Sequence, residues 1–492
     1  MSETSQAERF DVVIVGAGIS GIDAAYHLQR DCPERRYVVL DALESFGGTW
    51  WTHKYPGVRS DSDLYTFGYS FKPWTGDPIA KADRILAYMG EVISENEIDQ
   101  HIRYRHRVSD ASWSSDTNTW TLSVTDLASG ATETYHCEFL WMCQGYYRHE
   151  KGYTPEWPDF DSYEGRVVHP QTWPEEIDLA DKEVLVIGSG ATAATLVPSI
   201  ADQCRHVTML QRSPTYFFYG ENRDELADQL RALEINEEWI HEIVRRNRLA
   251  QLAMLNDLAR DEPAFLADEL IKLVRAALPE GYDVETHFTP RYRPWQQRLA
   301  YVPDADLFQG ISSGQASVVT DEIERFTPAG VLLKSGQELK ADVIITATGF
   351  ELSVLGDVHF TIDDKELDLA QTITYRGTMF TGVPNLSWIF GYFRASWTLR
   401  ADLVCAFICR ILNYMSQNDL HRVVPTLREE DRHGEVMSWI SEENFNPGYM
   451  MRSLHLMPKR LAKPEWEHSQ DYWFEKDILA SVPPNDDCLV YR

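Results

Sequence analysis

Cysteine is scarce and irregularly placed in this chain. Seven cysteines are scattered over 492 residues, and their odd number forms no regular disulfide framework. Such usage is typical of a reducing compartment, so we expect a cytoplasmic protein. No two cysteines have the C-x-x-C or C-x4-C spacing of a redox-active pair. This absence argues against a disulfide reductase, and no metal site is predicted.

Positive charge and long apolar runs are also lacking. The 46 Lys and Arg residues face 76 Asp and Glu, which leaves a net charge of −30. So acidic a surface repels nucleic-acid backbones and anionic membranes. No segment approaches the roughly 18 uninterrupted apolar residues that span a membrane. The best candidate, 403–415, is interrupted by Arg410 and Asn413, and we expect an amphipathic helix there. Residues 1–10 are polar and carry no secretory signal.

Two distant segments share one organisation. The apolar run 11–15 leads into Gly16, Gly18 and Gly21 and then into helical spacing, and the run 183–187 leads into a second glycine-rich turn. Each pattern predicts a buried parallel strand, a tight turn and a helix. A chain of this length exceeds one ordinary core. We therefore expect two dinucleotide-binding domains.

The remaining patterns suggest how these domains are arranged. Charged residues alternate with Leu, Ile, Trp and Met between 221 and 281, which predicts a helical insertion. The apolar run 343–349 is expected to re-enter the first domain's sheet. The predicted fold is therefore α/β, with two Rossmann-like domains and the second inserted in the first. The expected limits are 1–148 and 336–492 for the first domain, 149–220 and 282–335 for the second, and 221–281 for the insertion. The polar end, 483–492, is expected to be loosely held.

The first glycine motif has the features of a nucleotide site. Gly16 permits the tight turn, Gly18 lets a pyrophosphate approach the backbone, and Gly21 lets helix and strand pack closely. The helix that starts around Ser20 offers free N–H groups to the phosphates. Asp41 ends the next strand, where a carboxylate accepts ribose hydroxyls and repels a 2′-phosphate. The motif suits FAD or NAD, and the alternative is a purely structural turn.

The second motif differs at the position that selects the ribose. Its residues are Gly188, Ser189, Gly190 and Thr192. After the strand 207–210, Gln211 stands in the place of Asp41, and Arg212 and Ser213 follow. With no carboxylate to repel it and a guanidinium to bind it, a ribose carrying a 2′-phosphate suits this site. The alternative is that Arg212 is only a surface residue. Together the two motifs predict FAD in the first domain and NADPH in the second.

Two longer patterns identify a family. Segment 163–174 has Tyr163, Gly165, His169 and Trp173 at fixed spacing. It resembles the Baeyer–Villiger monooxygenase signature F-x-G-x-x-x-H-x-x-x-W-P/D, with Tyr in place of Phe. Relatives that oxygenate only nitrogen or sulfur generally have Phe or Tyr where this chain has Trp173. A second family signature, A/G-G-x-W-x-x-x-x-F/Y-P-G/M-x-x-x-D, is matched from Gly47 to Asp61; it includes Thr49 and Trp50.

The likeness covers nearly the whole chain. Segments 294–299 and 347–350 also look like family segments, and the chain resembles in particular the ethionamide-activating branch of these class B flavoprotein monooxygenases. The resemblance implies an oxidoreductase that inserts one oxygen atom from O2 into ketones, through a C4a-peroxyflavin. The products are esters or lactones, with sulfoxidation as a side activity.

The resemblance also assigns roles to single residues. It makes Arg298 the fixed cation that stabilises the peroxide anion, with Asp61 as its carboxylate partner. Taken alone, Arg298 would be a surface salt-bridge residue and Asp61 a turn cap. His169 is expected to hydrogen-bond backbone and to couple NADPH docking to domain movement. Trp50 is expected to pack near the flavin.

Two departures and two other functions stay open. Gln297 stands where many members have a Lys that helps to hold the 2′-phosphate, and Arg394 stands where this branch tends to have Asn. One hypothesis is that Arg394 binds an acidic substrate. The first alternative function is heteroatom oxygenation of thioethers, thioamides or amines, and the second is a non-enzymatic flavoprotein. The sequence leaves the physiological substrate, a ketone or a sulfide, and the oligomeric state undecided.

Overall fold

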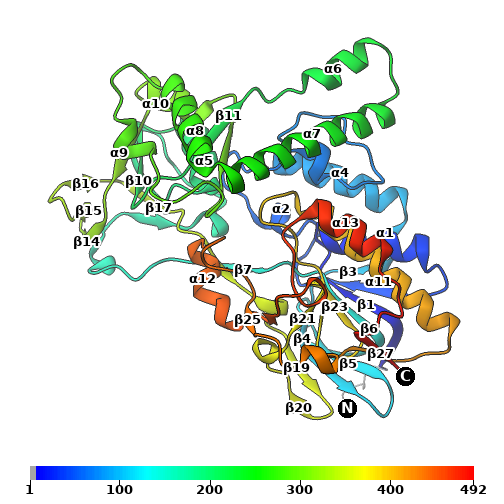
Figure 1. Cartoon of the computed structure of the whole chain (residues 1–492). Helices are drawn as coiled ribbons and strands as arrows, with labels where there is room; N and C mark the ends of the chain where they lie inside the picture. Colours follow the sequence, from blue (N-terminus) through cyan, green and yellow to red (C-terminus); the bar gives the residue numbers. More distant parts are fainter. Residues whose placement is uncertain (1–6) are drawn as a thin grey trace.

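The computed structural model describes residues 7–492 and has two α/β lobes (Figure 1). Residues 1–6, part of the polar N-terminus, lie outside the described residues. The first lobe is built on a nine-stranded sheet of order β20-β19-β4-β5-β6-β1-β2-β3, with β23 also paired to β6. Its strands are β1 (Glu8–Val15), β2 (Tyr37–Leu40), β3 (Ile102–Arg103), β4 (His106–Ser114), β5 (Thr119–Asp126), β6 (Thr132–Met142), β19 (His359–Ile362), β20 (Lys365–Glu366) and β23 (Leu386–Trp388).

Strand β1 shows why this sheet reads as a continuous apolar run. Val12 and Ile14 belong to one buried cluster, and Val13 and Val15 belong to another on the opposite face. Because both faces are covered there, the four positions from Val12 to Val15 are all apolar. The predicted parallel pairing of β1 with β2 through the helix between them is confirmed.

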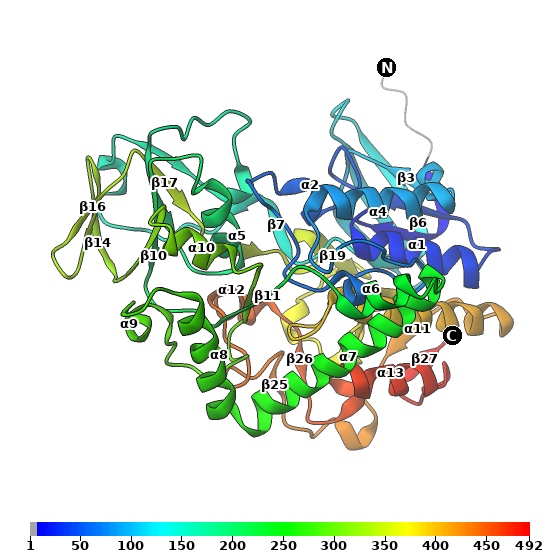
Figure 2. The ribbon, with the colours of Figure 1, turned by 90° about the horizontal axis from the view of Figure 1, so that it is seen from above.

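Helices cover one face of this sheet, and irregular C-terminal segments cover the other (Figure 2). The helices of the lobe are α1 (Ile19–Asp31), α2 (Thr49–Thr52), α3 (Leu64–Phe67), α4 (Ala82–Glu95), α11 (Trp397–Gln417), α12 (Gly448–Ser453) and α13 (Tyr472–Ser481). Helix α11 contains the predicted segment 403–415 and packs against α1. Within residues 7–492, no helix combines the length and apolar character needed to cross a membrane.

The second lobe contains a five-stranded parallel sheet of order β13-β10-β9-β17-β8. Its strands are β8 (Arg166–Val168), β9 (Glu183–Ile187), β10 (His206–Gln211), β13 (Ala316–Thr320) and β17 (Val343–Thr346). Helices α5 (Ala191–Ile200), α9 (Val284–Phe288) and α10 (Asp306–Ser312) pack on it, and β14 (Ile323–Thr327), β15 (Gly330–Leu333) and β16 (Glu338–Lys340) form an antiparallel sheet beside it.

The position of β17 corrects one prediction. The run 343–349 was expected to re-enter the first sheet, but β17 lies between β9 and β8, with Val343 paired to Val184. The chain leaves the second sheet only after Thr346, so the expected boundary at 335/336 falls too early. A short buried run fits either sheet equally well, and its partner is set by contacts distant in sequence. Strand β23, paired with Leu140–Met142 of β6, is a later return to the first sheet that the sequence reading missed.

The predicted helical insertion is present and reaches across to the first lobe (Figures 1 and 2). It consists of α6 (Glu225–Ala232), α7 (Glu237–Asp261) and α8 (Pro263–Ala277), and the paired strands β11 (Phe217–Gly220) and β12 (Ala300–Pro303) flank it. Helix α7 packs on α3 of the first lobe. There the buried Arg245 donates hydrogen bonds to the carbonyls of Tyr65, Thr66 and Gly68 at 2.9, 3.2 and 3.0 Å.

Two short strands carry the chain between the lobes. Strand β7 (Tyr147–Gly152) leaves the first lobe, and β18 (Phe350–Leu352) returns to it. The two pair antiparallel. The backbone N–H of Tyr153 extends the ribbon by donating to the Gly349 carbonyl at 3.0 Å. The crossings are therefore held together as one hydrogen-bonded ribbon.

The C-terminus differs from its prediction. Segment 483–492 was expected to be loosely held, but β27 (Leu489–Tyr491) pairs with β24 (Val423–Pro425), and Leu489 is buried. The strand consists only of Leu, Val and Tyr at the end of a polar segment, and three residues are too few to establish a strand pattern in the sequence. The remaining short strands are β21 (Thr374–Tyr375), β22 (Met379–Phe380), β25 (Met437–Ser438) and β26 (Lys459–Arg460).

Candidate active site

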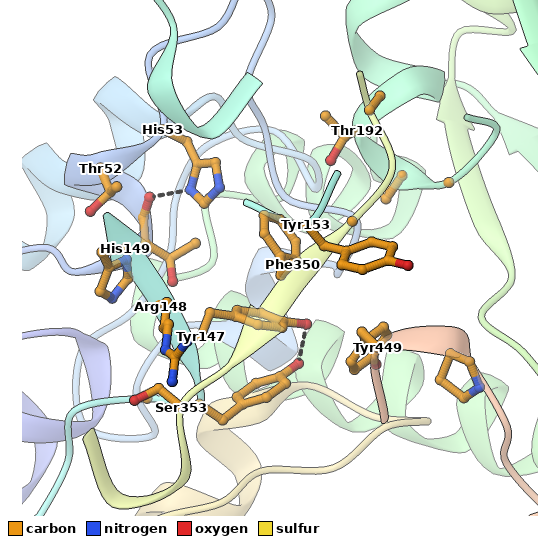
Figure 3. Close-up of a pocket in the computed structure, with 18 of the residues that line it drawn as sticks. Thr52, His53, Tyr147, Arg148, His149, Tyr153, Thr192, Phe350, Ser353 and Tyr449 are labelled. Carbon is orange, nitrogen blue, oxygen red and sulfur yellow. Dashed lines mark hydrogen bonds between the residues drawn. The ribbon is translucent and has the colours of Figure 1, made fainter. Parts of the chain in front are cut away.

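One large cavity lies between the two lobes, with a volume of about 1220 Å³. Both glycine motifs, the ends of the crossing strands and the C-terminal helix α12 contribute to its walls. Figure 3 shows part of it, with Thr192 of the second lobe facing Tyr153 and Phe350 of the crossing region. The cavity meets the carboxyl ends of β1 and β9, where parallel sheets bind their ligands.

The first glycine motif is shaped by three backbone constraints. Gly16 has a φ of +105°, in the region that favours glycine. A Cβ at Gly21 would lie 1.8 Å from the Gly16 carbonyl oxygen, so helix α1 packs directly on the turn. Gly18 faces open space apart from Gly48, 3.7 Å from the position of an added Cβ. The N-terminus of α1 is therefore accessible to a phosphate.

Asp41 holds this motif in place. It is buried, and its two carboxylate oxygens accept from the N–H groups of Ala17 at 2.5 Å and Leu43 at 2.7 Å. Burial raises its pKa even though both hydrogen bonds favour the charged form. Each oxygen keeps a second lone pair, so the carboxylate can also accept the ribose hydroxyls that the sequence assigned to it.

The second motif leaves its helix end equally open. Gly188 has a φ of +130°, and nothing lies within 4 Å of a Cβ added at Gly190, at the N-terminus of α5. The side chain of Gln211 turns inward and donates to the His287 carbonyl at 2.7 Å. Arg212 and Ser213 are exposed at the cavity. Two open helix ends at one cavity, with an acid at one and an arginine at the other, fit the predicted FAD and NADPH.

The second signature joins the lobes. Thr49 and Trp50 begin the short helix α2 at the cavity wall, and Trp50 packs edge-on against Phe67 at 5.8 Å. Gly57 lies against α5 of the second lobe, where an added Cβ would be 1.8 Å from the Ser199 hydroxyl oxygen. Four residues later, Asp61 reaches the same cavity.

Arg298 and Asp61 meet as predicted from the family, though loosely. The Arg298 Nη1 atom lies 3.8 Å from Asp61 Oδ2, and the two side chains are 34% and 35% exposed. They come from segments more than two hundred residues apart in sequence, and both line the cavity. An ion pair this open contributes little to stability, so its value lies in placing a cation at the cavity.

Three tyrosines surround this arginine, and the sequence reading missed them. Arg298 Nη2 lies 3.4 Å from the Tyr146 hydroxyl, and Arg298 Nε lies 3.4 Å from the Tyr449 hydroxyl. The Tyr147 hydroxyl donates to Tyr146 at 2.6 Å, a contact drawn in Figure 3. Tyr146 and Tyr147 follow β6 at the carboxyl end of a parallel strand, which is a usable signal. Tyr449 follows Pro447 and Gly448 in a short helix, and no sequence pattern predicts that it lies at the site.

The 163–174 signature supports the crossing region. The Tyr163 hydroxyl donates to the Ala341 carbonyl at 3.0 Å, and a Cβ at Gly165 would strike that tyrosine. The His169 ring packs on Gly152, and its Nδ1 accepts from the Gln171 N–H at 3.1 Å. Burial lowers the pKa of His169, so the ring is neutral at pH 7. Trp173 packs against the apolar cluster of the second lobe.

The two departures from the family pattern have different locations. Gln297 lines the cavity next to Arg298. Arg394 instead donates to the carbonyls of Asn444 at 2.6 Å and Trp295 at 3.3 Å, which ties the C-terminal loop to the segment before Arg298. Its guanidinium is engaged with backbone, so nothing here supports the acidic substrate guessed from the sequence.

Comparisons of the whole chain agree with these features. Residues 10–271 match the family described as pyridine nucleotide-disulphide oxidoreductase. The chain is 46% identical to "FAD-containing monooxygenase EthA" of Mycolicibacterium smegmatis, over 98% of this chain and 97% of that protein. It is 40% identical to "Probable FAD-binding monooxygenase AlmA" of an Acinetobacter species, over 99% and 97%.

Solved structures share the fold at low sequence identity. An oxidized steroid monooxygenase bound to NADP has a TM-score of 0.76 at 20% identity, over 98% of this chain and 99% of that one. The structure of OTEMO in complex with FAD and NADP has a TM-score of 0.75 at 21% identity, over 99% and 100%. The matched family is named after enzymes that act on disulfides. In the described chain all seven cysteines are free, so it contains no redox-active disulfide.

Proposed function

Because this chain belongs to the FAD-containing monooxygenases of the EthA branch, we propose that it oxygenates small ketones to esters or lactones, with sulfoxidation as a side activity. The observation that carries the proposal is the position of Arg298. It brings a fixed guanidinium and its Asp61 partner to the cavity that both nucleotide motifs share. The signature ending in Trp173 supports the same reaction class.

The two nucleotide sites supply the redox chemistry. The turn at Gly16 and Gly18 and the carboxylate of Asp41 would hold FAD, and Gly190 and Arg212 would hold NADPH. Together the bound cofactors would supply hydride transfer and the activation of O2. The adenosine selectivity follows from charge, because Asp41 repels a 2′-phosphate and Arg212 attracts one.

The chain's own residues explain why a ketone is a suitable substrate. Attack on a carbonyl carbon moves negative charge onto the carbonyl oxygen, and a fixed cation beside it lowers the barrier. Arg298 supplies this charge at the cavity, where Asp61 and two neighbouring phenols lie within 3.4 to 3.8 Å of its guanidinium. Oxidation of a sulfide develops no such oxyanion. The two reactions therefore differ in their need for Arg298.

Replacing Arg298 tests the proposal directly. We expect Arg298→Ala to reduce ester formation by about 100-fold or more, the loss typical of one missing oxyanion donor, and to retain sulfoxidation. Products would be identified by mass spectrometry with labelled O2, in FAD-loaded enzyme with NADPH. Arg260→Ala, an exposed arginine of α7, is the matched control.

Three results would contradict the assignment in different ways. If Arg298→Ala still forms ester, this arginine does not have the assigned role. Sulfoxide without ester in the wild-type enzyme places the chain among heteroatom oxygenases. Bound flavin without NADPH-dependent O2 consumption indicates a non-enzymatic flavoprotein.

A further inference from the structure

The hydroxyl of Tyr146 has an unused donor. A phenol oxygen can accept two hydrogen bonds and donate one. Tyr146 accepts from Tyr147 at 2.6 Å and from Arg298 Nη2 at 3.4 Å, so both acceptor positions are taken. No acceptor for its own O–H lies among residues 7–492. The side chain is only 9% exposed, and it lines the cavity.

Tyr449 presents a second donor of the same kind. Its hydroxyl accepts from Arg298 Nε at 3.4 Å, and within the described part of the chain its O–H also lacks an acceptor. It reaches the cavity from α12, and its ring lies next to that of Tyr146, with centroids 6.5 Å apart. Figure 3 shows the ring of Tyr449 beside the hydroxyl of Tyr147. One guanidinium thus orients two phenols from separate elements.

Both rings are held in place by packing, and that of Tyr449 lies edge-on to Tyr147 with centroids 5.9 Å apart. Tyr146 stacks on Trp397, with ring centroids 5.1 Å apart and planes 6° apart. Trp397 in turn donates to the Ser20 hydroxyl at 2.7 Å, within the first glycine motif. Burial raises the pKa of Tyr146, which keeps the phenol protonated and able to donate at neutral pH. The contacts of 3.4 Å to Arg298 are long, so an incoming oxygen can compete for these groups.

We propose that Tyr146 and Tyr449 donate hydrogen bonds to the carbonyl oxygen of the substrate, forming with Arg298 a site of three donors for a developing oxyanion. This inference rests on the proposed function and deepens it. The phenols lose no proton, because they stabilise the charge by donation alone. The site selects a carbonyl compound over a sulfide, since a thioether sulfur is a weak acceptor. Tyr147 is a positioning residue that acts through Tyr146.

Tyr→Phe variants test the two donors, since they remove one oxygen atom each and keep the rings. We expect Tyr146→Phe and Tyr449→Phe each to lower kcat for ester formation by about 100-fold. Sulfoxidation and the rate of flavin reduction by NADPH stay at wild-type values. Tyr414→Phe, which removes a half-buried phenol on α11 away from the cavity, is the matched control.

A binding measurement separates donation from general damage. A saturated lactam offers a carbonyl oxygen and does not react, and its affinity for the FAD-loaded enzyme can be followed by titration calorimetry. Loss of one donor weakens this affinity by about tenfold, the equivalent of one hydrogen bond. Affinity for the matching cyclic thioether stays unchanged.

The outcomes distinguish this inference from the function beneath it. Wild-type enzyme that forms no ester overturns the proposed function. Ester formation and lactam binding that survive in both Tyr→Phe variants overturn the oxyanion site and leave Arg298 in its role. An equal loss of sulfoxidation and ester formation, or a loss confined to the NADPH KM, assigns the phenols to the cofactor.

Discussion

Asp23 is a buried carboxyl group whose surroundings disfavour its charged form. It lies on α1 with no exposure, and no described group donates a hydrogen bond to either oxygen. His27 Nε2 lies 3.5 Å from Asp23 and 3.3 Å from Asp402 of α11. Burial raises the pKa of Asp23 well above its ordinary value near 3.8, and the charge of Asp402 raises it further. Between pH 3.8 and that higher folded pKa, Asp23 is protonated in the folded protein and ionised in an unfolded chain.

The sign of the pH dependence follows. The stability that protonated Asp23 contributes is complete below pH 3.8 and is lost as the pH rises through its higher folded value. Asn cannot ionise, so Asp23→Asn should gain stability relative to wild type with rising pH, by about 1.4 kcal/mol for each pH unit between the unfolded and folded pKa of Asp23. Melting temperatures between pH 5 and pH 9 would show the two curves diverging. Parallel curves would refute the raised pKa, and Asp116→Asn, at an exposed position, is the control.

At the scale of elements, the C-terminal helices are joined by a buried ion pair. Arg400 of α11 is fully buried and contacts Glu475 of α13 at 2.9 Å. It also donates to the carbonyls of Arg376 at 2.7 Å and Phe390 at 2.9 Å, while Glu475 accepts from the Tyr392 hydroxyl at 2.6 Å. Every one of these partners would be left in the core if the arginine were removed.

Arg400→Met should therefore be strongly destabilising. Removing one member of a buried pair costs about 3–5 kcal/mol, because the remaining charge stays uncompensated. Urea unfolding followed by tryptophan fluorescence would report the change. Arg260→Met, which breaks an exposed pair on α7, should cost at most about 1 kcal/mol. A loss below that limit in Arg400→Met would show that α13 is held by its apolar contacts instead.

The same scale explains what could be predicted from the sequence. The turn at Gly16 and the acid at Asp41 were predictable because strand, glycines and helix lie within thirty residues. The sheet that receives Val343 was not, because its neighbour Val184 is distant in sequence and a buried run fits either sheet. Tyr449 was invisible for a similar reason: its role depends only on its distance from Arg298.

At the scale of the whole molecule, α7 fastens the second lobe to the first. Arg245 caps three carbonyls at the end of α3, and its Nη2 also lies 3.9 Å from Asp402. Nearby, His241 Nδ1 accepts from the Trp74 N–H at 3.1 Å. These contacts lie far from the crossing ribbon, so they restrain the lobes at a second place.

Arg245→Ala should release this attachment without emptying the FAD site. We expect faster proteolysis within 221–281, normal FAD content and slower flavin reduction by NADPH, because the second lobe is less well placed. Limited proteolysis and stopped-flow absorbance would measure the two effects. The neighbouring Arg246→Ala is a close control, since Arg246 is exposed and pairs only with Glu242 in the same helix. If the two variants behaved alike, Arg245 would not be the residue that restrains the lobes.

The ribbon of β7 and β18 has a mechanical consequence. Two strands joined by hydrogen bonds resist stretching and shear, so the ribbon fixes the separation of the lobes where the chain crosses. The contacts of α7 hold the lobes at a second place, so the angle between them is set by both attachments. Tyr146 and Tyr147 stand at one end of this ribbon, and Arg298 lies beside them. The connection that joins the lobes therefore also places two of the phenols beside the arginine.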